Sequence, residues 1–178
     1  MSILKVCRLG NPVLRLKAKP VSENEIQESE FQILIRNMVE TMFEYVGVGL
    51  AAPQVHVALR VFVFRPEPEK EDSLRVVINP TLEPIGDELY EDWEGCLSIP
   101  DIQGRVTRFS RIRLKGLNHE AEKFEEEFEG FAARICQHEA DHLDGMIFFD
   151  RMDDLKTLTF GQEYHRFWAK KEESEGED

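Results

Sequence analysis

The sequence predicts a single α+β domain, in which mixed or antiparallel β-sheets pack around a central helix that carries the pattern H-E-x-x-H. Three observations lead to this fold class. An apolar stripe with helical spacing comes early in the chain, several strand-like runs follow it, and helical spacing returns near the end. This order of helix, grouped strands and helix is typical of α+β proteins.

The N-terminal part predicts an arm followed by a helix. Residues 8–20 are rich in turn-forming residues and are expected to be extended. The N-terminal helix is predicted over residues 25–45, where apolar side chains recur mostly at three- and four-residue steps. Gly47 and Gly49 then end it.

The middle of the chain carries the strand signals. Four runs are either rich in β-branched and aromatic residues or alternate between polar and apolar ones, and we expect strands at residues 58–64, 74–80, 111–117 and 123–130. A charged loop, EPEKEDS, separates the first two.

Helical spacing returns over residues 130–144, and Gly145 is placed to stop that helix. A last helix is expected in FGQEYHRFWAKK, residues 160–171. We find no internal repeat or linker in this chain of 178 residues, so we expect one domain over residues 1–171 and an acidic, disordered tail over residues 172–178.

Composition excludes several classes of function. The formal charge of −13 argues against non-specific binding of nucleic acid. No apolar run approaches the length of a membrane span, and no signal peptide is evident, so we expect a cytoplasmic protein without membrane contact. The three cysteines form no disulfide framework, which suits a reducing compartment.

The stretch QHEADHLDG predicts a metal-binding helix. His138 and His142 are four residues apart, so both can reach one ion from the same helix face. Glu139 can lean toward an open metal position without being a ligand and accept a proton from water there. The alternative is a solvated helix without a metal, on which Asp141 and Asp144 would simply face water; Asp141 could instead orient a ligand.

A catalytic metal site needs a third protein ligand. The extended zinc-protease pattern fails downstream, because Gly145 fits it but Phe148 stands where a histidine is required. Upstream, Cys96 in EGCLS offers a soft thiolate that suits a transition metal. The alternative for Cys96 is a small buried apolar residue.

A third unusual stretch is GVGLAAPQ, residues 47–54. Its glycines and alanines leave a backbone that another chain can approach closely, and Gln54 ends it with a side chain that donates and accepts hydrogen bonds. The alternative is a helix stop followed by a turn. It is not a dinucleotide-binding fingerprint, since it follows a helix and lacks the third glycine.

Together these three stretches resemble the peptide deformylase family. That family carries G-x-G-x-A-A-x-Q, E-G-C-x-S and Q-H-E-x-D-H in this order, and every signature position matches here. The resemblance spans roughly residues 4–155, nearly all of the predicted domain, which it implies to be catalytic.

The resemblance implies a metal-dependent hydrolase that removes the N-terminal formyl group from formyl-methionyl nascent polypeptides and releases formate. Cys96, His138 and His142 would hold one metal ion per chain, Fe(II) in the cell, with zinc, nickel or cobalt as substitutes. Glu139 would be the general base and acid for a metal-bound hydroxide that attacks the formyl carbon. The Gln54 side chain and the Leu97 backbone N–H would stabilise the developing oxyanion.

The resemblance also implies where the substrate, a nascent chain at the ribosome, would bind. An apolar pocket for methionine is expected from residues near the motifs, and peptide backbone contacts are expected from the two glycine-containing stretches. These substrate-binding candidates are Val48, Gly49, Glu94, Gly95, Phe131, the aliphatic part of Arg134, and Ile135.

Several residues depart from the family pattern or fall outside it. Many relatives have an arginine where this chain has Gln103, and a glycine where it has His56. Glu94 is expected to pair with Arg108 and so pin the cysteine loop. Cys7 and Cys136 are predicted to be packing residues, and His119 and His165 to be solvated. Two other functions remain open at this point: a zinc endopeptidase, and a non-catalytic metal- or peptide-binding member of the same fold.

Overall fold

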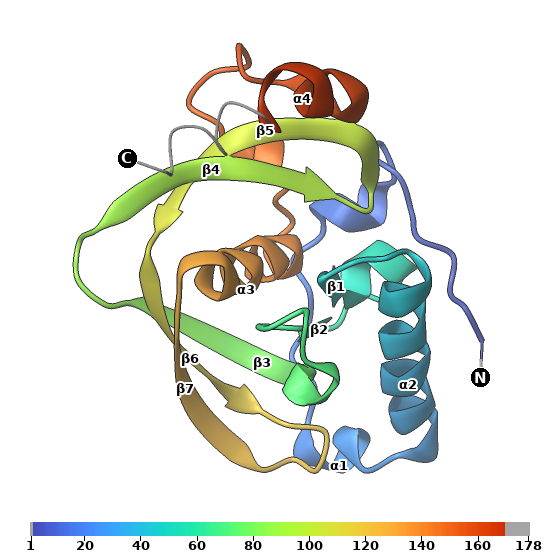
Figure 1. The fold of residues 1–178 in the computed structure, drawn as a ribbon. Coiled ribbons are helices and arrows are strands. Elements are labelled where there is room, and N and C mark those ends of the chain that lie inside the picture. Colours follow the sequence, from blue (N-terminus) through green and yellow to red (C-terminus); the bar gives the residue numbers. More distant parts are fainter. Residues whose placement is uncertain (1, 170–178) are drawn as a thin grey trace.

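The computed structural model describes residues 2–169, so the predicted tail and the end of the predicted domain lie outside the described part. Helix α3 lies between two antiparallel sheets, with α2 on one flank and α4 across the outer side of the smaller sheet (Figure 1). The α-helices are α1 (Glu23–Ile26), α2 (Ser29–Glu44), α3 (Gly130–Leu143) and α4 (Gly161–Phe167). The predicted α+β fold class is confirmed.

The larger sheet has five strands in the order β1-β2-β3-β6-β7, all antiparallel. Its strands are β1 (Gly49–Ala51), β2 (Val61–Phe64), β3 (Arg75–Pro84), β6 (Arg111–Leu117) and β7 (Lys123–Glu129). The four predicted strands are all present, although β2 is shorter and β3 longer than expected. Strand β2 is buried on both faces, which fits its unbroken apolar sequence.

The smaller sheet has the order β4-β5-β8, and the sequence analysis did not predict it. Its strands are β4 (Leu89–Cys96), β5 (Ile99–Phe109) and β8 (Thr159–Phe160). Strand β4 contains four acidic or glycine positions, and β5 contains a proline, an aspartate and a glycine. Such residues are uncommon in strands, so the local composition hid the pairing, which extends along nearly the whole of both strands.

The predicted helix over residues 25–45 is two helices. Ser22 and Glu25 form a capping box that starts α1. Glu28 has extended backbone angles at the start of α2, so the chain turns between them. Both helices pack their apolar faces against β1 and β2 in one buried core, and Ile26, Met38 and Met42 are fully enclosed there.

Helix α3 is nearly enclosed. Ala133, Cys136 and Leu143 pack with Phe62 and Phe64 of the larger sheet, while the opposite side of α3 faces β4 and β5 (Figure 1). Cys136 is therefore a core residue, as predicted. After α3 the chain continues through Gly145, which has a left-handed backbone (φ +75°) that favours glycine. Among the described residues, no helix is both long and apolar enough to cross a membrane.

Candidate active site

The two histidines of the H-E-x-x-H pattern lie one turn apart on α3 and face Cys96, the last residue of β4. The Cys96 Sγ and one nitrogen of each imidazole all lie within 4.8 Å of one another, and Sγ is 3.3 Å from His142 Nε2. Within the described residues, this is the one cluster of three or more such side chains arranged to hold a metal ion. One thiolate and two imidazoles fit a transition metal rather than magnesium or calcium.

The surroundings of Cys96 favour the thiolate form of its side chain. Burial alone would keep the thiol neutral, but His142 and His138 lower the pKa of Cys96 well below its ordinary value. Burial instead raises the pKa of Cys136, well above the usual range, and that of Cys7. The thiolate is the species that binds metals, so Cys96 is the cysteine of the three that is suited to bind a metal ion.

Glu94 fixes the orientation of His138 from behind. Its Oε2 lies 2.9 Å from His138 Nδ1, which leaves Nε2 for the metal position. Arg108 binds both oxygens of Glu94 in a fork, with distances of 2.8 Å and 2.9 Å. Burial opposes ionisation of Glu94, but the hydrogen bonds from Arg108 and His138 hold its pKa well below the usual range. The predicted pair between Glu94 and Arg108 is therefore present.

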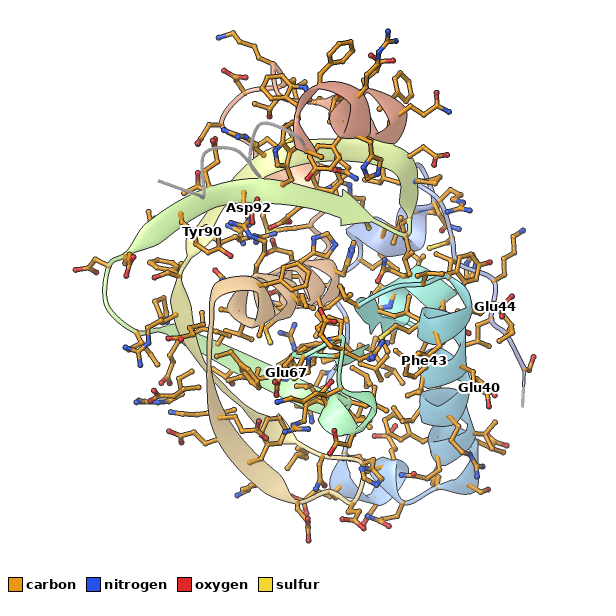
Figure 2. The ribbon with its side chains drawn as sticks, viewed as in Figure 1. Glu40, Phe43, Glu44, Glu67, Tyr90 and Asp92 are labelled. Carbon is orange, nitrogen blue, oxygen red and sulfur yellow. The ribbon has the colours of Figure 1, made fainter. Side chains whose placement is uncertain are left out.

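Arg134 completes this buried ion network from α3. Its NH1 donates to Glu94 Oε1 at 2.8 Å, and its guanidinium also donates to the backbone oxygens of Tyr90 (3.0 Å) and Asp92 (3.5 Å). Tyr90 and Asp92 lie on β4 (Figure 2). Since arginines and His138 occupy both Glu94 oxygens, Glu94 orients a histidine. Glu94 also lines the cavity described below, and its expected contact with substrate stays a prediction.

The position of Asp141 decides whether it faces water or supports a ligand, which the sequence left open. It is buried, and its Oδ2 accepts a hydrogen bond from Arg108 NH1 at 2.6 Å. Arg151 binds its other oxygen from the surface side at 2.6 Å. Asp141 therefore does not face water; it supports the arginine that holds Glu94.

Glu139 lies beside the metal position but outside the ligand cluster. The residue is only 4% exposed, and burial raises its pKa to about 7. A carboxylate with such a pKa can both accept and return a proton near neutral pH. Gly49 of β1 is packed directly against it.

The Gln54 side chain is held with its amide nitrogen toward Cys96. Its Oε1 accepts a hydrogen bond from the Ala51 N–H at 2.8 Å, so Nε2 must be the atom that faces Cys96 Sγ (3.5 Å) and Ser98 Oγ (3.3 Å). Ser98 is fully buried. The sequence analysis assigned Ser98 no role. Its position in EGCLS, two residues after Cys96, could have indicated that it lies close to the site.

These groups open into one cavity of about 970 Å³. All the predicted site residues except His142 line it, namely Val48, Gly49, Gln54, Glu94, Gly95, Cys96, Leu97, Phe131, Arg134, Ile135, His138 and Glu139. Phe160 and His165 also line it. His165 is exposed, as expected, and it also lines the cavity. Nothing in the local sequence indicated that the last helix folds back over the site.

Comparisons with known proteins agree with this geometry. The family model of polypeptide deformylase matches residues 3–158. Among curated proteins, peptide deformylase 1 of Prochlorococcus marinus is 40% identical over 167 residues, covering 90% of this chain and 86% of the relative. The peptide deformylase of Halothermothrix orenii is 45% identical over 153 residues, covering 85% of this chain and 95% of the relative.

Solved structures of peptide deformylases have the same fold as this chain. The peptide deformylase of Thermotoga maritima superimposes with a TM-score of 0.80 at 41% identity, covering 86% of this chain and all of that chain. A class I type b peptide deformylase from Acinetobacter baumannii gives 0.81 at 40% identity, covering 85% and 100%. The resemblance that rests on three short motifs thus extends over most of the chain, and the chain belongs to the polypeptide deformylase family.

Proposed function

We propose that this chain is a metal-dependent hydrolase that removes the N-terminal formyl group from formyl-methionyl polypeptides and releases formate. The observation that carries the proposal is the cluster of Cys96, His138 and His142 beside the buried carboxylate of Glu139. Family membership supports the same activity. Related structures contain actinonin or the peptide Met-Ala-Ser, which supports a peptide substrate.

The proposed metal ligands are Cys96, His138 and His142, with one ion per chain. Fe(II) is the proposed ion in the cell, and zinc, nickel or cobalt would fit the same donors. When bound, the ion would polarise the formyl oxygen and increase the acidity of water at its open position.

Glu139 is the proposed general base and acid. It would take a proton from the attacking water as the new carbon–oxygen bond forms at the formyl carbon. It would then give that proton to the departing amine as the carbon–nitrogen bond breaks, leaving formate and a free N-terminus. Burial raises its pKa, which favours both transfers, because a catalytic group is most effective when its pKa lies near the working pH.

Negative charge develops on the formyl oxygen during this reaction, and Gln54 and Leu97 would stabilise it. The Gln54 amide N–H faces the site because Ala51 holds its oxygen. The Leu97 backbone N–H would be the second donor. A preorganised donor of this kind contributes about 3–4 kcal/mol to the transition state.

The methionine side chain would enter the apolar part of the cavity formed by Val48, Phe131, Ile135 and the stem of Arg134. Gly49 and Gly95 would let the substrate backbone approach β1 and β4, as an added strand. The proposed natural substrates are nascent chains at the ribosome, in the cytoplasm.

The test is formate release from formyl-Met-Ala by protein loaded anaerobically with Fe(II). We expect turnover by the wild type, loss of turnover with a chelator, and at least a hundredfold lower kcat in Glu139→Ala. Wild-type protein that releases no more formate than this variant would overturn the proposal. Cys96→Ala distinguishes the endopeptidase alternative: it should lose its metal here, whereas a zinc endopeptidase with a downstream ligand would keep it.

A further inference from the structure

The Leu97 N–H, which would be one of the two oxyanion donors, belongs to a tight turn. Leu97 and Ser98 form the turn that joins β4 to β5, and Cys96 pairs with Ile99 across it. Leu97 also lines the cavity. The direction of its N–H is therefore set by the backbone conformation of this turn.

The turn has a backbone that a two-residue hairpin loop does not favour by itself. Such loops prefer turns in which at least one of the two central residues has a positive φ, because these turns match the twist of the strands. Neither Leu97 nor Ser98 has a positive φ. We therefore expect contacts from outside the hairpin to hold the turn in this conformation.

Those contacts come from the N-terminal arm. Arg8 NH1 donates a hydrogen bond to the Leu97 backbone oxygen. The Leu9 N–H donates to the Ser98 backbone oxygen at 2.8 Å. Each backbone oxygen of the turn thus has a hydrogen-bond donor on the arm.

The same stretch of the arm also holds the segment that carries the other oxyanion donor. The Cys7 N–H donates to the Gln54 backbone oxygen at 2.8 Å, and Cys7 Sγ lies 3.4 Å from the Pro53 oxygen. Residues 7–9 therefore connect the two segments that would supply the oxyanion donors. Cys7 is buried, whereas Arg8 is exposed and lines the cavity.

We propose that Arg8 is a positioning residue, which holds the turn so that the Leu97 N–H points at the developing oxyanion. This rests on the proposed function. Arg8 would not touch the reacting atoms, because it acts through the Leu97 carbonyl group. Since Arg8 is exposed, water can replace its hydrogen bond, and its loss should disturb the orientation of the donor rather than the fold.

The test measures formate release by the metal-loaded protein from formyl-Met-Ala-amide, which has no C-terminal carboxylate that Arg8 could bind directly. We expect Arg8→Ala to lower kcat by about threefold to tenfold, the cost of one hydrogen bond, with KM unchanged. Arg8→Lys should recover part of this loss, because an ammonium group can donate to a single oxygen. Binding of the product Met-Ala-amide, measured by calorimetry, should be the same in all three proteins, because the product contains no oxyanion.

Arg15→Ala is the matched control. Arg15 is another exposed arginine of the arm; it donates to the Gly145 backbone oxygen at 3.4 Å and pairs with Asp150. It does not line the cavity, so its kcat should equal that of the wild type. An unchanged kcat in Arg8→Ala, or a loss of product affinity as large as the loss in kcat, would overturn the positioning role.

Hydrogen–deuterium exchange over residues 94–99 provides a readout that needs no turnover. Exchange should be faster in Arg8→Ala than in the wild type and Arg15→Ala, because the turn then opens more often. Equal exchange in the three proteins would contradict the proposal. If the wild type releases no formate and exchange is still faster only in Arg8→Ala, the proposed function fails, while Arg8 remains the residue that holds the turn.

Discussion

Gly49 and Glu139 occupy a space that only one side chain can fill. A Cβ built on Gly49 would lie 2.3 Å from Glu139 Oε1 and 2.8 Å from its Cδ, far inside van der Waals contact. The first motif therefore contains glycine at this position because the carboxylate of the third motif lies against its backbone.

Gly49→Ala should accordingly displace the Glu139 carboxylate and lower kcat for formate release by about a hundredfold or more. Metal content should be unchanged, because the alanine does not touch the three ligands. The double variant Gly49→Ala/Glu139→Gln provides the control. If it is no slower than Glu139→Gln alone, the glycine acts through the carboxylate; additive losses would contradict this explanation.

Cys96 should be the one cysteine that reacts readily with iodoacetamide in chelator-treated protein at neutral pH. The neighbouring histidines lower its pKa, although burial opposes this, whereas burial raises the pKa of Cys7 and Cys136. The thiolate is the reactive form. Peptide mass spectrometry should find one alkylated site, and prior loading with nickel should protect it. Labelling of Cys136 at a similar rate would contradict the assignment.

Arg108→Ala should strongly destabilise the fold. Its side chain is 4% exposed and holds the carboxylates of Glu94 and Asp141. Removing it takes one cationic partner from each of two buried carboxylates, although Arg134 and His138 still contact Glu94 and Arg151 still contacts Asp141. We expect a cost of up to about 3–5 kcal/mol in the free energy of unfolding. Urea unfolding of chelator-treated protein would measure this without a contribution from metal binding.

Arg113→Ala is the matched control for that experiment. Arg113 also pairs with two carboxylates, those of Glu125 and Glu127, but on the exposed face of the β6–β7 hairpin. Exposed ion pairs contribute little, so its effect should be much smaller. Equal losses of stability in the two variants would show that burial of the Glu94 network is unimportant.

Ser98→Ala should lower kcat by about threefold to tenfold, the cost of one hydrogen bond, with little change in KM. Ser98 Oγ lies 3.3 Å from Gln54 Nε2 and helps to hold the amide that would face the formyl oxygen. Gln54→Ala should cost more, about a hundredfold or greater. In a Gln54→Ala background the serine change should have no further effect on kcat; an undiminished loss would assign Ser98 a separate role.

The site was more predictable than the fold around it. His138, Glu139 and His142 belong to one helical turn, so their spacing alone placed them together. Cys96 was a candidate from its thiolate chemistry, but the family resemblance was needed to choose it over a buried apolar residue. Its contact with His142 joins residues 46 apart in the sequence, which local spacing cannot predict. The missed strands have a different cause. Strands β4 and β5 form a hairpin between neighbouring segments, but their acidic, proline and glycine residues give weak local strand signals.

The remaining differences have similar causes. The turn at Glu28 that divides the first helix is set by local capping, which the apolar stripe concealed. The position of His165 at the cavity depends on how α4 docks against Trp93. The spacing of apolar residues over 160–171 could not predict that contact, since it involves a strand about seventy residues earlier in the chain.

Cys96 and His142 are 46 residues apart in the sequence and belong to different layers, one to the smaller sheet and one to the helix packed on the larger sheet. An ion bound by both therefore acts as a reversible cross-link that closes a long loop and lowers the entropy of the unfolded chain. Metal loading would therefore also stabilise the folded chain. A copy that has lost its ion would also be the copy whose two layers separate most easily, and so the one that cellular proteases remove first.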